Sequence, residues 1–375
     1  MPSVENNARL HIMNRPPIRI LDLKGTPEEM GHKHGTTYAD EIKIYTNERI
    51  HLASGQFWGG QEITESQVIE IAESCLPAHE KHSPELYAEM CAMAEGAGIT
   101  PAEAVVVGGF TDFVDTIRNT FGGPYPTDVI EDDCTAFIIP DSKANGKGLY
   151  GQTWDMHDTA TDHVVLMRIQ PENAPDALIF STVGCVGQIG MNNQGVCVGI
   201  NNLVGTDGCP GVMWPSVVRA ALATSNANEA LNEVLSADLA GSHSFLIFDS
   251  SGTGYMIEAM PTARPYATME ETPLVHTNHV LWDQAKPVEA LRDPTIKANS
   301  ENRLSRAAEL LNQEELTVED LMSVTRDPEA ICRTSVDPYH IESSGAAIMR
   351  PQTLDFWAVW GIPSANEYVH VPFNE

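Results

Sequence analysis

The sequence changes character at Cys134, and this change constrains the fold more than any other feature. Before it, three segments carry the same helix-start signal, in which Glu or Gln follows a threonine by three residues. These segments are Thr26-Pro27-Glu28-Glu29, Thr64-Glu65-Ser66-Gln67 and Thr100-Pro101-Ala102-Glu103. After it, short β-type runs dominate and are separated by turn sequences such as NGKG, NNQG and DSSGTG. Helices first and strands afterwards predict a layered α+β fold.

The predicted strands lie in CTAFIIP, HVVLMRI, ALIFSTVG, VCVGI, SFLIF, GYMIEA, PLVHT, DFWAVWG and EYVHVPF. Two helical stretches interrupt them, WPSVVRAALATSNANEALNEVL and NSENRLSRAAELLN. We therefore expect two stacked sheets covered by helices. No repeat, low-complexity segment or linker is visible, so we expect one domain over residues 1–375.

The charge balance argues against two classes of partner. Lys and Arg total 22 against 52 Asp and Glu, a formal net charge of −30. Such an acidic chain is poorly suited to a broad contact with nucleic acid or with an anionic membrane. No signal-peptide h-region and no membrane span is visible, and the seven cysteines form no disulfide or metal pattern. We expect a cytoplasmic protein with free thiols.

Several familiar catalytic patterns are absent from the sequence, namely GxSxG, HExxH, the P-loop and GxGxxG. Two histidine pairs remain as metal candidates, His32 with His34 in GHKHG and His276 with His279 in HTNH. No acidic residue or cysteine lies at a recognisable ligand spacing from either pair. We expect neither a metal nor an organic cofactor, and a metal-dependent hydrolase stays as an alternative.

Cys134 stands in EDDCTAFIIP, directly after three carboxylates. Negative neighbours keep a thiol protonated and so unreactive, and a cysteine that opens a strand is usually a small buried apolar residue. The preceding FGGPYPTDVI, however, reads as an exposed loop, in which a chain break would cost little packing. Cys134 therefore has two interpretations, an inert core residue or one activated by cleavage.

A series of motifs bears on this choice: GTPEEMGHKHG, MAEGAGIT, DDCTAF, GQTWDM, VGQIGMNNQGVCVGINNL, GSHSF, HTNHV and EAICR. In order and spacing they resemble the acyl-CoA:6-aminopenicillanate acyltransferase-like proteins, also called the C45 peptidase family. These are N-terminal-nucleophile (Ntn) hydrolases, and carcinine- and β-alanyl-amine hydrolases belong among them. The resemblance implies an αββα sandwich of two mostly antiparallel sheets covered by helices.

The resemblance also implies autoproteolysis between Asp133 and Cys134. It would give a helical chain, 1–133, and a catalytic chain, 134–375, which together form an α/β heterodimer. The α-amine released on Cys134 would have a pKa of about 8, so it could act as the general base for the thiol of the same residue. The best-known family member has glycine where this chain has Asp133.

By the same resemblance, Cys134 is the nucleophile and three further residues complete the site. Asp155 in GQTWDM would hold the α-amine, and Asn278 in HTNH would donate to the oxyanion. Arg333 in EAICR would pair with Asp155 or with a substrate carboxylate. Without the motifs, each would read as an ordinary residue: a turn aspartate, a turn-capping asparagine and a solvated arginine.

The expected function is hydrolysis of a small acyl-amine amide through a thioester acyl-enzyme, with N-acyltransferase activity as a second capacity. The partners are the small-molecule amide, acyl-CoA as a candidate donor and a second copy of the chain in a homo-oligomer. Hydrolysis is preferred because no basic cluster is evident for the phosphates of CoA. A binding protein that keeps the fold without catalysis is the other alternative.

Overall fold

A computed structural model describes residues 15–121, 134–337 and 339–374. The N-terminal third forms one strand and a group of helices: β1 (Ile20–Gly25), α1 (Pro27–Thr37), α2 (Ala39–Ser54), α3 (Gln56–Gly59), α4 (Glu65–His82), α5 (Pro84–Ala97), α6 (Pro101–Gly108) and α7 (Phe110–Phe121). The three predicted helix starts are confirmed. Thr26, Thr64 and Thr100 are N-caps of α1, α4 and α6, each in a capping box.

From Cys134 onward the chain builds two sheets and four further helices among the described residues. The strands are β2 (Ala136–Ile139), β3 (Leu149–His157), β4 (Val164–Pro171), β5 (Ala177–Thr182), β6 (Ile189–Asn192), β7 (Val196–Leu203), β8 (Ser242–Asp249), β9 (Gly254–Ala259), β10 (Tyr266–Thr268), β11 (Leu274–His276), β12 (Ile341–Arg350), β13 (Asp355–Trp360) and β14 (Val369–His370). The helices are α8 (Trp214–Leu222), α9 (Ala227–Ser236), α10 (Pro294–Leu310) and α11 (Val318–Thr325).

The larger sheet has the order β1-β4-β5-β6-β7-β8-β9-β10, and the smaller one β11-β2-β3-β12-β13-β14. All neighbouring strands run antiparallel except β1 and β4, which are parallel. Strand β1 therefore brings the N-terminal third into the same sheet as the later strands. The register runs from Ile20 opposite Leu166 to Gly25 opposite Pro171.

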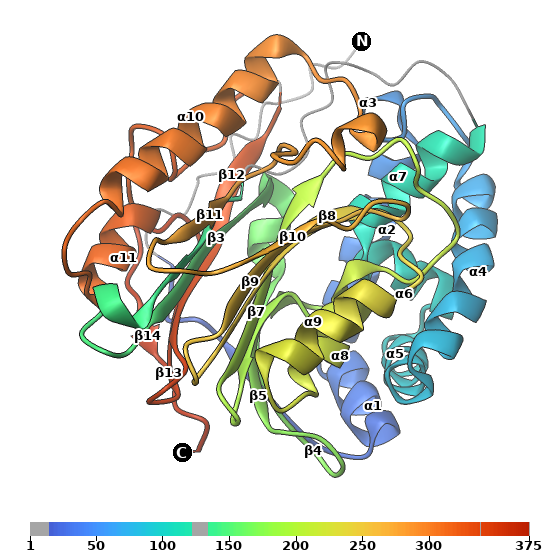
Figure 1. Cartoon of the computed structure of the whole chain (residues 1–375). Coiled ribbons are helices and arrows are strands. Elements are labelled where there is room, and N and C mark those ends of the chain that lie inside the picture. Colours follow the sequence, from blue (N-terminus) through green and yellow to red (C-terminus); the bar gives the residue numbers. More distant parts are fainter. Residues whose placement is uncertain (1–14, 122–133, 338, 375) are drawn as a thin grey trace.

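The two sheets stack face to face. The side chain of Gln152, on β3 of the smaller sheet, is hydrogen-bonded to the backbone of Ile200 on β7 of the larger sheet. A Cβ atom on Gly199 would overlap Tyr150 Oη and Gln152 Oε1, so only glycine permits this approach. Figure 1 shows α10 and α11 on one side of the stacked sheets, and α8 and α9 with the N-terminal helices on the other. The predicted αββα sandwich is confirmed.

Five of the strands in the described residues were not among the predicted ones, namely β1, β3, β6, β10 and β12, and two of these, β3 and β12, lie at the centre of the smaller sheet. β3 has the sequence LYGQTWDMH and β12 has IESSGAAIMR, and both are almost wholly buried. Their polar and small residues break the alternating apolar pattern by which a strand is recognised in a sequence. These polar residues are tolerated in the core because their side chains have hydrogen-bond partners inside the protein. The nine predicted strands all correspond to observed ones.

Among the described residues, no single helix is long and apolar enough to cross a membrane. One helix pair bent by 103°, α5 with α6, passes the test of length and composition only when the two are taken together.

Candidate active site

Cys134 lies immediately before β2 and is completely buried. Its Sγ accepts a hydrogen bond from the backbone N–H of Asp155 over 3.5 Å and lies 3.8 Å from the Asp155 carbonyl oxygen. The contact follows from the pairing of β2 with β3, in which Ala136 faces Gln152. Two of the four predicted residues are thus brought together by the sheet itself. Asp133 lies outside the described residues.

A buried arginine connects Cys134 to Asn278. Nη1 of Arg303 donates to the carbonyl oxygen of Cys134 over 2.6 Å, and its Nη2 donates to Asn278 Oδ1 over 3.0 Å. The same Nη1 lies 3.3 Å from Thr135 Oγ1, and Nε donates to Asn299 Oδ1 over 2.9 Å. Arg303 is fully buried in α10. The planar guanidinium therefore fixes the relative position of Cys134 and Asn278.

Asn278 follows β11, and α10 holds the segment that carries it. The Asn278 N–H and His279 Nδ1 both contact Ser300 Oγ, at 2.9 and 2.8 Å. One N–H of the Asn278 side chain donates to the Asn202 carbonyl over 3.0 Å. An amide nitrogen carries two hydrogens, so a second donor remains on Nδ2 for another oxygen. Hydrogen bonds at both Nδ2 and Oδ1 therefore hold the Asn278 side chain in one orientation.

Asp155 is fully buried, and one residue, Ser343, connects it to Arg333. Ser343 of β12 is the ladder partner of Asp155. The backbone N–H of Arg333 donates to Ser343 Oγ over 2.9 Å, and the Ser343 N–H donates to the Arg333 carbonyl over 3.1 Å. Arg333 is half-buried in the segment between α11 and β12, rather than solvated near a helix end. All four predicted residues thus belong to one end of the smaller sheet and its flanking segments.

Two buried polar residues were missed by sequence reasoning, Arg303 beside Cys134 and Asn201 in the larger sheet. Arg303 lies in a helical stretch that also contains Arg306. The only signal of its burial is that it lies three residues after the buried Ser300, on the same face of α10. Asn201 lies on β7 and pairs with Ser244. It is completely buried, and neither polar atom of its side chain has a hydrogen-bond partner among the described residues. The sequence signal that could have identified Asn201 is the pair of consecutive asparagines in the otherwise apolar run VCVGINNL, since polar residues within a buried strand call for a specific reason.

The two histidine pairs form different environments. Nε2 of His34 accepts from the Gly184 N–H over 3.1 Å, and burial lowers the pKa of His34 to about 4. His32 is exposed. His276 contacts Glu258 Oε1 over 3.0 Å, and burial lowers the pKa of His279 to about 4. No group of three or more His, Cys, Asp or Glu side chains suited to a metal ion occurs in the described part of the chain.

The two stacked sheets between layers of helices have the αββα arrangement of the Ntn-hydrolase fold. The chain belongs to the acyl-coenzyme A:6-aminopenicillanic acid acyl-transferase family, whose model matches residues 142–356, more than half of the sequence. The matched residues include Asp155, Asn278, Arg303 and Arg333, and they begin after Cys134.

One curated relative is the acyl-coenzyme A:6-aminopenicillanic-acid-acyltransferase 40 kDa form of Emericella nidulans, 24% identical over 319 residues, which are 83% of each chain. A solved structure of a mutant conjugated bile acid hydrolase from Clostridium perfringens aligns with 64% of this chain and 97% of its own, at 13% identity and a TM-score of 0.43. Penicillin V acylase from Agrobacterium tumefaciens aligns with 63% of this chain and 78% of its own, at 12% identity and a TM-score of 0.33. Membership in the family supports an enzyme of amide hydrolysis or acyl transfer.

Proposed function

We propose that the protein is an autoproteolytic N-terminal-cysteine amidohydrolase that acts on a small acyl-amine amide and can also transfer the acyl group. One observation carries the proposal. Cys134 stands at the head of β2 against the backbone of Asp155, and Arg303 joins its carbonyl oxygen to the side chain of Asn278. This arrangement supports the proposal, because the residues proposed as nucleophile, oxyanion donor and carboxylate belong to neighbouring segments at one end of the smaller sheet.

In the proposed self-cleavage, Cys134 Sγ attacks the carbonyl carbon of Asp133. A C–S bond forms, the peptide C–N bond breaks, and the thiol proton passes to the nitrogen that becomes the α-amine of Cys134. Water then hydrolyses the thioester, which releases the Asp133 carboxylate and the free Cys134 thiol. The contact of Arg303 with the Cys134 carbonyl is compatible with both states, because that carbonyl lies on the side of the residue that is not cut.

In the proposed turnover, the free α-amine takes the proton of the Cys134 thiol, and the thiolate attacks the amide carbon of the substrate. The second N–H of Asn278 Nδ2 would donate to the oxygen that becomes negative. Collapse of this intermediate expels the amine, which receives the proton, and leaves a thioester on Cys134. Water completes hydrolysis, and an acceptor amine would complete acyl transfer.

Three other residues have supporting roles in this proposal. The buried Asp155 carboxylate would orient the α-amine of Cys134 by accepting a charge-assisted hydrogen bond from it. The backbone of Arg333 is hydrogen-bonded to Ser343, the residue paired with Asp155 in the sheet. Its guanidinium would neutralise the Asp155 carboxylate or bind a carboxylate of the substrate. Arg303 would act as a positioning residue, because it donates to the carbonyl oxygen of Cys134 and to Asn278 Oδ1.

The test compares the wild type with Cys134→Ala by mass spectrometry under denaturing conditions, N-terminal sequencing and a panel of small amides. Cys75→Ala is the matched control, because Cys75 is also buried but lies in α4. We expect two chains, one beginning with Cys134, in the wild type and the control, and one inactive full-length chain in Cys134→Ala. Active material whose only N-terminus is Met1 or Pro2 would contradict the proposal. Loss of activity on chelation would instead favour the metal-dependent alternative.

A further inference from the structure

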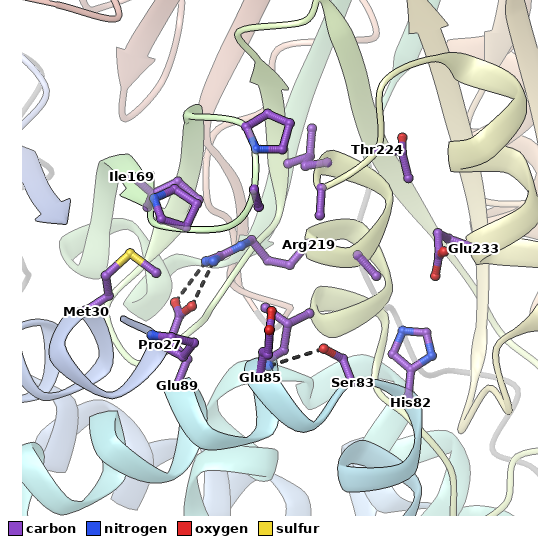
Figure 2. Close-up of a pocket in the computed structure, with 17 residues that line it drawn as sticks. Pro27, Met30, His82, Ser83, Glu85, Glu89, Ile169, Arg219, Thr224 and Glu233 are labelled. Atoms are coloured by element: carbon purple, nitrogen blue, oxygen red, sulfur yellow. Dashed lines mark hydrogen bonds and ion pairs between the residues drawn. The ribbon is translucent and has the colours of Figure 1, made fainter. Parts of the chain in front are cut away.

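A cavity far from Cys134 in the fold lies between α1, the junction of α4 and α5, α8, α9 and the turn after β4 (Figure 2). Its volume is about 240 Å³, and none of Cys134, Asp155, Asn278 and Arg333 lines it. An apolar cavity of about 150 Å³ is enough to hold a benzene molecule. The space is therefore sufficient for a ligand with one aromatic ring and a short side chain.

The floor of this cavity is a closed ion pair. Figure 2 shows Arg219 extending from α8 to Glu89 on α5. Nη1 of Arg219 donates to Glu89 Oε1 over 2.9 Å, and Nη2 donates to Oε2 over 2.8 Å. Arg219 Nη1 also donates to the Val186 carbonyl over 2.9 Å. Both side chains are nearly inaccessible. An anionic ligand would have to displace Glu89 to reach this guanidinium, which would leave a buried carboxylate unpaired at high cost.

The remaining polar groups of the cavity favour a cation. Glu85, which is exposed, and Glu233, which is half-buried, both line it. His82 Nε2 is buried and has no hydrogen-bond partner among the described residues. Burial lowers the pKa of His82, so the ring adds no positive charge beside Glu233 at pH 7, while Nε2 itself has no accessible surface and is out of reach of a ligand. Helix α8 also ends at the cavity, with the negative end of its dipole.

The rest of the wall is apolar. Met30, Leu86, Ile169 and Leu222 supply side chains that would cover the body of a ligand. An apolar wall with a few convergent polar groups is the usual composition of a small-molecule site. Since the net charge of the whole chain is −30, its field also concentrates cations at the surface.

We propose that this cavity binds a small organic ammonium ion with an apolar body of about one aromatic ring. Its N–H groups donate to the Glu233 carboxylate, and its body lies on Leu86, Ile169 and Leu222. The amine released by amide hydrolysis is of this chemical class, so the product could occupy the site; this last link alone rests on the proposed function.

The test measures binding to the full chain by titration calorimetry and ligand-observed NMR. The probes are phenethylamine, its neutral isostere phenethyl alcohol and the anionic hydrocinnamate. We expect the amine to bind at least about tenfold more tightly than either isostere. Glu233→Gln should weaken the binding of the amine about two- to fivefold, as for a partly exposed ion pair. Ala220→Phe, which fills the cavity from α8, should abolish binding.

Glu301→Gln is the matched control, because it removes the same charge from an exposed position on α10 outside the cavity. Equal weakening by Glu301→Gln and Glu233→Gln would show attraction by the overall charge and would overturn the site. Binding of the alcohol as tight as that of the amine, or amine binding that survives Ala220→Phe, would overturn it as well. No turnover is needed, so the same titration on Cys134→Ala separates this proposal from the proposed function.

Discussion

Replacing Arg303 by methionine should uncouple the nucleophile from the oxyanion donor without removing either. In the structure, the guanidinium is the donor that joins the Cys134 carbonyl, at 2.6 Å, to Asn278 Oδ1, at 3.0 Å. Methionine fills part of the same volume but carries no N–H group. The Asn278 side chain would then be free to rotate away from the position in which Nδ2 meets an oxyanion.

The magnitude follows from these contacts. Two fully buried acceptors lose a donor, and each such loss costs about 1–3 kcal/mol, so Arg303→Met should reduce the free energy of unfolding by about 2–6 kcal/mol. Deleting an oxyanion donor typically lowers kcat by about 10²–10³, and displacing one should cost less, about 10- to 100-fold. Since Arg303 acts through other residues in this reasoning, KM should change much less than kcat. Arg303→Lys should fall between the two, because an ammonium lacks the planar fork.

The assay is steady-state hydrolysis of the best amide from the panel, normalised to the folded and processed fraction. Folding is followed by circular dichroism and processing by denaturing mass spectrometry. Arg306→Met serves as the control, because Arg306 lies three residues further along α10 and contacts Asp327 instead. A folded, processed Arg303→Met protein with kcat within twofold of the wild type would refute the reasoning. An equal loss of kcat in Arg306→Met would refute it too.

Three further predictions concern stability. Burial lowers the pKa of His34 to about 4, so the unfolded chain binds its proton more readily, and stability should fall as the pH drops from about 6.5 towards 4. Between these two pH values, the free energy of unfolding of His34→Gln, measured by urea titration, should fall by up to about 3 kcal/mol less than that of the wild type. The same pH dependence in both proteins would contradict this. Gly199→Ala should cost about 1–3 kcal/mol in thermal unfolding, because the new Cβ meets Tyr150 and Gln152 of the opposite sheet. At Gly55, where a Cβ meets nothing closer than 3.4 Å, alanine should have little effect, and equal losses at both sites would be the contrary result. Thr64→Ala should cost about 1 kcal/mol through the lost capping box of α4, and an unaltered denaturation midpoint would be inconsistent with that contact.

The sequence predicted best what depends on near neighbours. The hydroxyl of Thr26, Thr64 or Thr100 and the side chain three residues later form a cap by themselves, so local spacing is enough to place three helices. The two-layer sheet arrangement was also predictable, since alternating apolar runs have to bury one face.

What could not be predicted depends on distant partners. Arg303 and Arg306 look alike in NSENRLSRAAELLN, yet one is fully buried against Cys134 and the other pairs with Asp327 near the surface. Only the packing of α10 on the smaller sheet distinguishes them. The strand β12 was missed for a similar reason, because Ser343 and its neighbours are polar residues that the surrounding structure makes acceptable in a core. The proposed roles of Cys134, Asp155, Asn278 and Arg333 stay predictions.

The pairing of β1 with β4 has a consequence for any form of the protein cut before Cys134. The upstream fragment would supply an outer strand of the larger sheet and the whole helical layer from α1 to α7, so neither piece has a complete core of its own. The halves would behave as an obligate pair that migrates as one species in native gel filtration and separates only in denaturant. Expressed alone, the downstream piece would present β4 as an unprotected sheet margin, open to self-association.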